Sequence, residues 1–195
     1  MDNKKIKELV KQVHDNAVKH GWHDEEHSKE HYLMLIITEV CEMVDADRCG
    51  RHAKKDDFIE RMNREPKDEA KEMYEQNFYY AFKSRIKETV EDEMADVCIR
   101  ILDMAGEYCL DLDLNLPGIY NSSNEEFTYR CYNLVTYLAD WDLVDDDDHL
   151  AWHLSIILVA LSQWAEHDGI DLDWHIQQKM KFNALRPYKH GGKKY

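Results

Sequence analysis

Two pairs of acidic residues, each spaced three positions apart, lie in stretches whose apolar residues recur at helical spacing. The first pair is Glu39 and Glu42, and the second is Glu93 and Asp96. Residues three apart project from the same face of an α-helix, so two such helices side by side would bring four carboxylates together. Converging carboxylates repel one another unless a cation lies among them, and oxygen-only ligands suit Mg²⁺ or Mn²⁺. The pattern therefore predicts a metal site between two helices.

Acidic pairs are common in a chain with 40 Asp and Glu residues, and most of them lie on solvated surfaces. The first acidic helix, however, has apolar residues on both sides of its glutamates. These residues are Leu33, Ile36, Ile37, Val40 and Val44 on the main stripe, with Leu35, Met43 and Ala46 beside the glutamates. A helix that is apolar on two sides packs on two sides. This favours a partly buried position for Glu39 and Glu42.

The second acidic helix has one apolar stripe, formed by Val90, Met94, Val97, Cys98, Ile101 and Ala105. Glu93 lies at the edge of this stripe, and Asp96 lies further round the helix with Arg100 and Asp103. A carboxylate at the edge of a buried stripe needs a partner. A metal ion is one candidate for that partner, and Arg100 is the structural alternative.

Long helices are compatible with this chain because its 195 residues include only seven Gly and three Pro. Helical spacing predicts helices over about 3–20, 28–49, 85–109, 125–142, 149–168 and 171–185. We expect an insertion of one or two helices over 51–83, a loop over 111–124, and a helix cap formed by the acids at 145–148. No strand-like alternation of useful length occurs, so the sequence predicts a single all-α domain over 1–195.

Several classes of protein are excluded by composition. No run reaches 18 apolar residues and the first residues are polar, so neither a membrane span nor a signal peptide is expected. The five cysteines lack C-x-x-C spacing and are predicted to be reduced, buried thiols of a cytoplasmic protein, with Cys41 and Cys98 on core stripes. A net charge of −15 argues against DNA or RNA as a partner.

The charge is unevenly distributed, because residues 179–195 carry six basic residues and no acid. The other residues hold 19 basic groups against 40 acidic ones, a net charge of −21. A basic C-terminal segment of this kind is either a solvated tail or a source of cations for phosphates held at the acidic site. An acidic metal site and a basic arm are the two features that a nucleoside triphosphate requires.

The sequence around the acidic pairs resembles that of a known protein family. The stretches that carry the resemblance are LIITEVCE at 35–42, EDEMADVCIRILD at 91–103 and KMKFNALRPYKHGG at 179–192. Together they resemble the all-α nucleoside triphosphate pyrophosphohydrolases, the MazG-like superfamily that also includes the dimeric dUTPases. The resemblance covers roughly 1–50, 84–112 and 170–195. The 50 residues between Glu42 and Glu93 exceed the usual spacer, and segments 51–83 and 113–168 look like insertions to which the resemblance assigns no role.

The resemblance implies a MazG-like helical bundle that hydrolyses a nucleoside or deoxynucleoside triphosphate to the monophosphate and pyrophosphate, with Mg²⁺ or alternatively Mn²⁺. Glu39, Glu42, Glu93 and Asp96 would be the metal ligands, and Glu39 is the preferred catalytic base. The substrate contacts would be Lys179, Asn183, Arg186, Lys189 and His190, with Trp22 stacking on the base. The alternatives are a nucleotide-binding protein without turnover and a helical scaffold.

A homo-oligomer is also expected, a dimer first and a tetramer second. The two apolar sides of the first acidic helix suggest an interface, and the resemblance implies pairing of helices from two chains. The basic segment would then lie near the metal site in the same chain or across the interface.

Histidines form further candidate patterns. His149 and His153 recur at i, i+4, as do His23, His27 and His31, a spacing that can bind Zn²⁺ or Ni²⁺. Surface or interface histidines are the favoured interpretation. The His-Asp dipeptides at 14–15, 23–24 and 167–168 are of the kind that an HD-type phosphohydrolase needs, but the sequence places no metal set around them.

Overall fold

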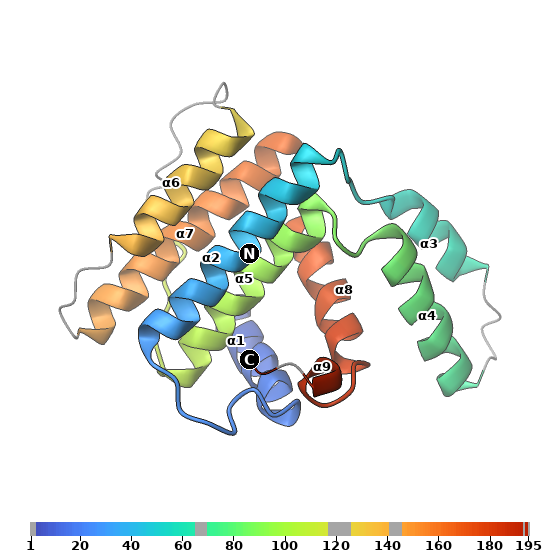
Figure 1. Ribbon diagram of the computed structural model, residues 1–195, viewed down its shortest axis with the longest axis horizontal. Helices are drawn as coiled ribbons and strands as arrows, with labels where there is room; N and C mark the ends of the chain where they lie inside the picture. Colours follow the sequence, from blue (N-terminus) through green and yellow to red (C-terminus); the bar gives the residue numbers. More distant parts are fainter. Residues whose placement is uncertain (1–2, 65–69, 117–125, 141–145, 193, 195) are drawn as a thin grey trace.

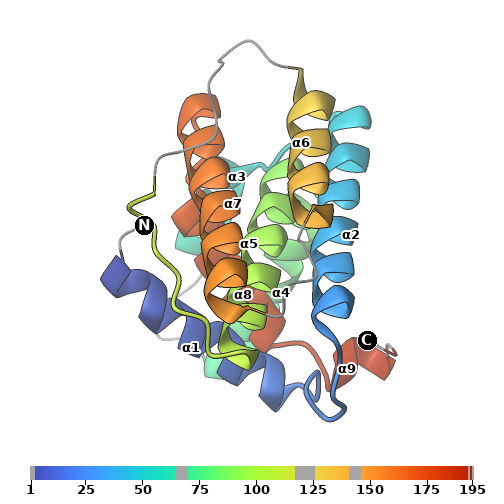
Figure 2. The same cartoon turned by 90° about the vertical axis from the view of Figure 1, so that its left-hand side faces the viewer.

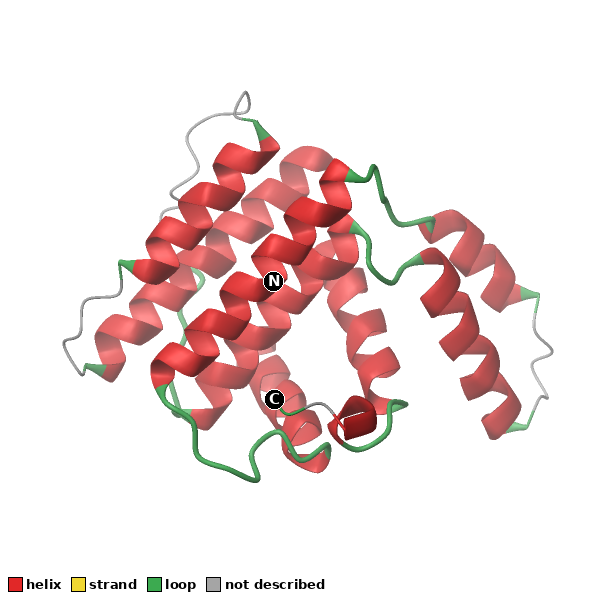
Figure 3. Ribbon diagram, in the orientation of Figure 1, coloured by secondary structure: helices red, strands yellow, loops and turns green. Residues whose placement is uncertain are grey.

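The computed structural model describes residues 3–64, 70–116, 126–140, 146–192 and 194. These residues form nine helices and no strand (Figure 3), which confirms the all-α prediction. Within this part of the chain, no helix combines the length and the apolar character that crossing a bilayer requires.

The helix boundaries agree with the predicted ranges to within a few residues. The helices are α1 (Asn3–Lys19), α2 (Lys29–Arg48), α3 (Lys55–Asn63), α4 (Lys71–Arg85), α5 (Val90–Glu107), α6 (Phe127–Ala139), α7 (Asp147–Asp168), α8 (Leu172–Ala184) and α9 (Lys189–Gly192). The two acidic helices begin at side-chain caps. The Ser28 hydroxyl accepts a hydrogen bond from the His31 amide of α2, and the Thr89 hydroxyl accepts one from the Asp92 amide of α5.

The predicted cap before α7 is present, since the Asp146 carboxylate accepts a hydrogen bond from the Asp148 amide at 3.0 Å. Asp145 lies outside the described residues, as do residues 117–124 of the predicted loop. The last element, α9, was not predicted. Its residues His190 and Gly191 have positive φ angles, so the segment is a left-handed turn. Apolar periodicity does not predict such a turn.

The centre of the molecule is the pair α2 and α5, with α1 and α8 packed against α5 (Figure 1). The apolar stripes of the two acidic helices face each other in one large core. Residues such as Ile36, Val40, Met94 and Ile101 are almost completely buried there. This packing holds α2 and α5 side by side, which is the condition that the acid pairs need in order to meet.

The first predicted insertion forms two helices, α3 and α4, which lie at the opposite end of the molecule from α6 and α7 (Figure 1). A second, small and mainly aromatic core holds them together and to α8. This core contains Phe58, Phe78, Ala81, Phe82, Ile86 and Phe182. The insertion is therefore attached to the helix that carries the basic C-terminal segment.

The second insertion forms α6 and α7. Helix α6 packs on α2 and α7 packs on α5, so the pair covers one side of the central helices (Figure 2). On the second apolar side of α2, Met43 and Ala46 are buried within the chain and Leu35 is half-buried. Most of this side therefore needs no second chain to cover it. The oligomeric state itself stays a prediction.

The cysteine prediction is partly wrong. Cys98 and Cys131 are buried, but Cys41 is exposed together with Cys49 and Cys109. Cys41 is directly adjacent to Val40 in sequence, about 100° round the helix from it, and this rotation takes it off the buried face. All five cysteines are free thiols.

Candidate metal and phosphate site

Three of the four predicted metal ligands meet between α2 and α5. Carboxylate oxygens of Glu39, Glu42 and Glu93 lie within 4.8 Å of one another. Glu39 and Glu93 are buried, with 8% and 3% of their surface exposed, whereas Glu42 is exposed at the mouth of the site. One turn of α2 thus supplies two oxygens, and the first turn of α5 supplies the third.

Asp96 belongs to a second, overlapping group with Asp92 and Glu93, whose carboxylate oxygens also lie within 4.8 Å of one another. The sequence reading did not identify Asp92 as a site residue. Its position in the first turn of α5 is typical of an acid that only complements the helix dipole. In the structure Asp92 is 1% exposed, and its Oδ1 atom has no hydrogen-bond partner among the described residues.

Lys179 of α8 reaches into this second group. Its ammonium nitrogen lies 2.7 Å from Asp92 Oδ2 and 2.5 Å from Asp96 Oδ2. The side chain was predicted to hold phosphates, but it is 4% exposed and forms buried ion pairs with two carboxylates. Burial lowers the pKa of Lys179, but the charges of Asp96, Asp92 and Glu93 outweigh burial and raise it. Lys179 is therefore a fixed positive charge inside the acidic site, and direct contact with phosphate stays a prediction.

Arg100 was the structural alternative to a metal as the partner of a carboxylate at this site. The structure pairs it with Glu39, whose Oε1 accepts a hydrogen bond from Arg100 Nε at 2.9 Å. Among the described residues, Glu93 forms no such ion pair with a cation. Each half of the site thus has one built-in cation, Arg100 beside α2 and Lys179 beside the first turn of α5.

The pKa values of Glu39 and Glu93 reflect their burial and the negative charge around them. Burial, followed by the charge of Asp96, raises the pKa of Glu93 to about 9. Burial and the charge of Asp96 raise the pKa of Glu39 to about 7, although Arg100 opposes this rise. With no further cation present, Glu93 therefore holds a proton at neutral pH. A divalent cation that binds here would displace that proton.

The donor set fits Mg²⁺ or Mn²⁺. It contains only carboxylate oxygens, which these ions prefer, and neither a thiolate nor an imidazole is among the ligands. Glu39, Glu42, Glu93 and Asp96 are the residues that would hold the ion.

A pocket of about 140 Å³ opens beside these carboxylates. Five of the six predicted substrate contacts also line it, and these are Trp22, Lys179, Asn183, Arg186 and His190. The side-chain oxygen of Asn183 is buried and has no hydrogen-bond partner among the described residues. A buried polar atom without a partner is costly, so this atom is suited to a ligand.

Lys189 is the predicted contact that does not line the pocket. Its backbone amide donates a hydrogen bond to the His20 carbonyl at 2.9 Å. The role of Lys189 in the structure is therefore to attach the C-terminal segment to the end of α1, while a contact of its side chain with phosphate stays a prediction.

The C-terminal segment closes the pocket within the same chain. His20 Nε2 lies 3.1 Å from the Arg186 carbonyl, and the rings of Trp22 and His190 meet edge to face at 5.0 Å between centroids. Gly21 has a φ of +79°, and a Cβ atom there would lie 2.2 Å from the Tyr188 ring. The connector after α1 therefore needs a glycine at this point to receive the C-terminal segment.

The predicted surface or interface histidines are only partly as expected. His27 and His31 stack with their ring centroids 4.1 Å apart. His153, however, is buried, and its Nε2 atom meets the Tyr137 carbonyl of α6. His153 is therefore a contact between α6 and α7, because the i, i+4 spacing places it on the packed face of α7.

Comparison with known proteins adds no relative. No protein-family model, no curated protein and no solved structure was found that matches this chain. The resemblance to the MazG-like superfamily thus stays a prediction from the motifs.

Proposed function

We propose that this chain hydrolyses a nucleoside or deoxynucleoside triphosphate to the monophosphate and pyrophosphate, with Mg²⁺, or Mn²⁺ in its place. We propose for it a housekeeping role in the cytoplasmic nucleotide pool. The observation that carries the proposal is the meeting of Glu39, Glu42 and Glu93 in one pocket that Arg186 and Asn183 also line. A triphosphate is bound by a metal ion, which acidic ligands hold, and by cationic and polar side chains that donate hydrogen bonds to the phosphate oxygens.

The roles of the acidic residues follow from their positions. Glu39, Glu42, Glu93 and Asp96 would hold the metal, which supplies positive charge to offset that of the phosphate oxygens. Arg100 holds one oxygen of Glu39, and we assign the other oxygen to the attacking water, whose proton it accepts. Water then attacks the α-phosphorus, and pyrophosphate leaves.

The size of the pocket supports an assignment for the two ends of the substrate. A volume of about 140 Å³ is below the roughly 300–1,000 Å³ of pockets that enclose a whole small molecule. The pocket thus suits the phosphates, with the guanidinium of Arg186 offering two parallel donors to their oxygens. The base would lie at the opening, where Trp22 and His190 provide aromatic rings.

The test is an assay for pyrophosphate with Mg²⁺ and each canonical ribo- and deoxyribonucleoside triphosphate. Glu42→Gln and Glu93→Gln should abolish turnover while the far-ultraviolet circular dichroism stays helical. Asp47→Asn, on the same helix as Glu42 but outside the pocket, is the matched control and should keep normal turnover. Turnover that survives in both Gln variants at limiting Mg²⁺ would exclude this site as the catalytic one.

A second candidate is a protein that binds a nucleotide without hydrolysing it. The observation that favours it is the ion pair of Lys179 with Asp96, since a carboxylate already paired with an ammonium group attracts a metal less strongly. In that case nucleotides would raise the melting temperature by mass action, and no pyrophosphate would form. A helical scaffold, the third alternative, would show neither effect.

The chain is also proposed to form a homodimer, with a tetramer second. Exposed Met34 of α2 and Trp152 of α7 border a groove between α2, α6 and α7, and such apolar patches are typical of interfaces. Light scattering should give at least twice the 23.2 kDa of one chain, and a monomer mass at micromolar concentration would contradict the proposal.

A further inference from the structure

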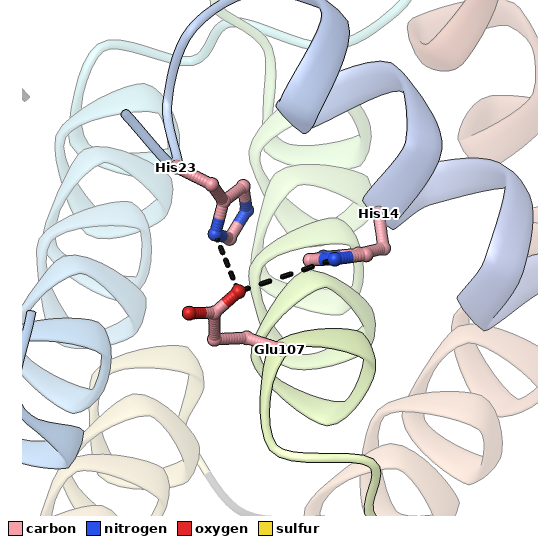
Figure 4. A group of neighbouring side chains, drawn as sticks. All are labelled: His14, His23 and Glu107. Atoms are coloured by element: carbon pink, nitrogen blue, oxygen red, sulfur yellow. Dashed lines mark ion pairs between the residues drawn. The ribbon is translucent and has the colours of Figure 1, made fainter. Parts of the chain in front are cut away.

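A group of histidine and carboxylate side chains lies at the other end of α5. It contains His14 from α1, His23 from the connector after α1, and Glu107 from the last turn of α5 (Figure 4). Asp103, one turn earlier on α5, lies beside both histidines. Glu107 follows Glu93 by 14 residues, a separation of about 21 Å along a helix. Glu107 is therefore far from Glu93 along α5, and the donor chemistry of this group differs from that of the acidic site, although Asp103 also lines the acidic pocket.

Three donor atoms of the group converge. Glu107 Oε2 lies 2.8 Å from His23 Nδ1 and 4.0 Å from His14 Nε2 (Figure 4). One donor atom from each of these three residues lies within 4.8 Å of the other two. Ligands of tetrahedral Zn²⁺ at bond lengths of about 2.0–2.1 Å stand roughly 3.3 Å apart. Side-chain adjustments of about an ångström would therefore bring the three atoms to that spacing.

The remaining ring nitrogens of both histidines meet a single carboxylate. Asp103 Oδ1 lies 3.2 Å from His14 Nδ1 and 2.9 Å from His23 Nε2. When Asp103 accepts an N–H from each ring, the lone pairs of His14 Nε2 and His23 Nδ1 are left to face Glu107. A carboxylate that holds the far nitrogen of each imidazole is the usual surrounding of metal-ligating histidines.

The close approach of α1 to α5 at this point depends on a glycine. A Cβ atom at Gly106 would lie 2.5 Å from His14 Cβ and 2.7 Å from His14 Cγ. Glycine inside a helix is less favourable than alanine. The chain tolerates this cost at a position where any larger residue would push His14 away from the group.

We propose that His14, His23 and Glu107 bind a transition-metal ion of the Zn²⁺ class, with Asp103 orienting both imidazoles. Three protein ligands leave one tetrahedral position for water, and the Tyr32 hydroxyl, 3.2 Å from His23 Nδ1, lies beside the group. Imidazole nitrogen selects Zn²⁺ over Mg²⁺. The bound ion would tie α1 and the connector that carries Trp22 to the end of α5.

The test titrates Co²⁺, and then Zn²⁺ in competition, into the full chain after chelation, with millimolar Mg²⁺ present to fill the acidic site. We expect one equivalent of Co²⁺ with the strong visible absorption of a tetrahedral, nitrogen-containing site, and displacement of it by Zn²⁺. His23→Gln and Glu107→Gln should each lose this absorption and weaken Zn²⁺ binding at least 100-fold. Asp103→Asn should weaken it 10- to 100-fold, since it removes orientation but no ligand.

Two control variants separate this site from other binding. His52→Gln removes an exposed histidine that also lies beside a carboxylate, with its Nδ1 atom 3.1 Å from Glu91 Oε1, and Glu42→Gln alters the acidic site. Both should bind Zn²⁺ as the unaltered chain does. If His23→Gln also binds Zn²⁺ normally, or if the unaltered chain binds none at 100 μM metal, the group is only a set of ion-paired histidines. Circular dichroism of each variant establishes that a loss of binding is not a loss of fold.

Discussion

Replacement of Lys179 by methionine tests the electrostatics of the acidic site directly. The substitution keeps an unbranched side chain but removes the charge that lies 2.7 Å from Asp92 and 2.5 Å from Asp96. Asp92 is 1% exposed, and its Oδ2 atom would retain a hydrogen bond only from the Glu88 amide at 3.0 Å. Removal of one partner from a buried ion pair costs about 3–5 kcal/mol. For a chain of this length, that loss corresponds to a fall in melting temperature of about 6–20 °C.

A double-mutant cycle assigns this loss to the ion pair. Lys179→Met, Asp92→Asn and the double variant are unfolded in urea with chelator present, and the coupling between the two sites should be about 2 kcal/mol or more. In Asp92→Asn/Lys179→Met no unpaired charge remains at position 92, so the double variant should be more stable than Lys179→Met alone. Lys181→Met is the matched control on the same helix, where the ammonium group contacts the exposed Tyr74 hydroxyl.

The reasoning fails if Lys179→Met loses less than about 1 kcal/mol, the range of a surface ion pair. It also fails if the effects of the two substitutions simply add. Either result would mean that the Lys179 charge does not stabilise the acidic site. If Lys179→Met does lose the expected stability, addition of Mg²⁺ should restore part of it, because a divalent ion supplies the cation that the carboxylates lack.

Three further predictions concern protons and the C-terminal segment. Mg²⁺ binding at pH 7.5 should release about one proton, since Glu93 has a pKa of about 9 before the metal binds. Calorimetry in buffers of different ionisation enthalpy measures the number of protons released, and zero release would contradict the assignment of Glu93 as a metal ligand. Burial lowers the pKa of His175 to about 4, so the unfolded chain binds a proton that the folded chain excludes, and the contribution of His175 to stability falls as the pH drops from about 6.5 towards 4. Glu93 and Glu39 have raised pKa values and act in the opposite direction, so the His175 contribution is measured as a difference between variants. In urea unfolding, the change in stability from pH 8 to pH 5 should be about 2 kcal/mol more favourable in His175→Leu than in the unaltered chain, and His52→Gln should show no such difference. Truncation after Ala184 removes Arg186 but no carboxylate, so it should raise the KM for triphosphate at least tenfold and leave Mg²⁺ affinity unchanged, whereas an unchanged KM would exclude a role for the segment.

Much of the fold follows from local pattern. The helices that carry the acid pairs were predictable because a period of 3.6 residues is visible within each segment, and Ser28 and Thr89 mark their starts. The convergence of Glu39, Glu42 and Glu93 followed from one further assumption, that the two apolar stripes pack on each other. That assumption is correct in the structure.

The parts that could not be predicted depend on contacts between distant segments. Asp92 and Lys179 are 87 positions apart, and nothing near either residue indicates the other. His14 and His23 were visible only as members of His-Asp dipeptides and an i, i+4 series. Their relation to Glu107 depends on how α1 turns back towards α5, which no local pattern encodes.

The balance of charge in the acidic site bears on how a triphosphate could bind there. The site brings together the carboxylates of Glu39, Glu42, Asp92, Glu93 and Asp96 and the cations of Arg100, Lys179 and Arg186. Lys87 and Asp103 also line the pocket, but Lys87 is paired with Glu88, and Asp103 with His14 and His23. One divalent ion would bring such a site close to neutral. A triphosphate adds several further negative charges, and in a partly buried pocket these repel the carboxylates strongly. The proposed substrate must therefore enter with a metal ion of its own, and the remaining cations of the C-terminal segment would reduce the charge that is left.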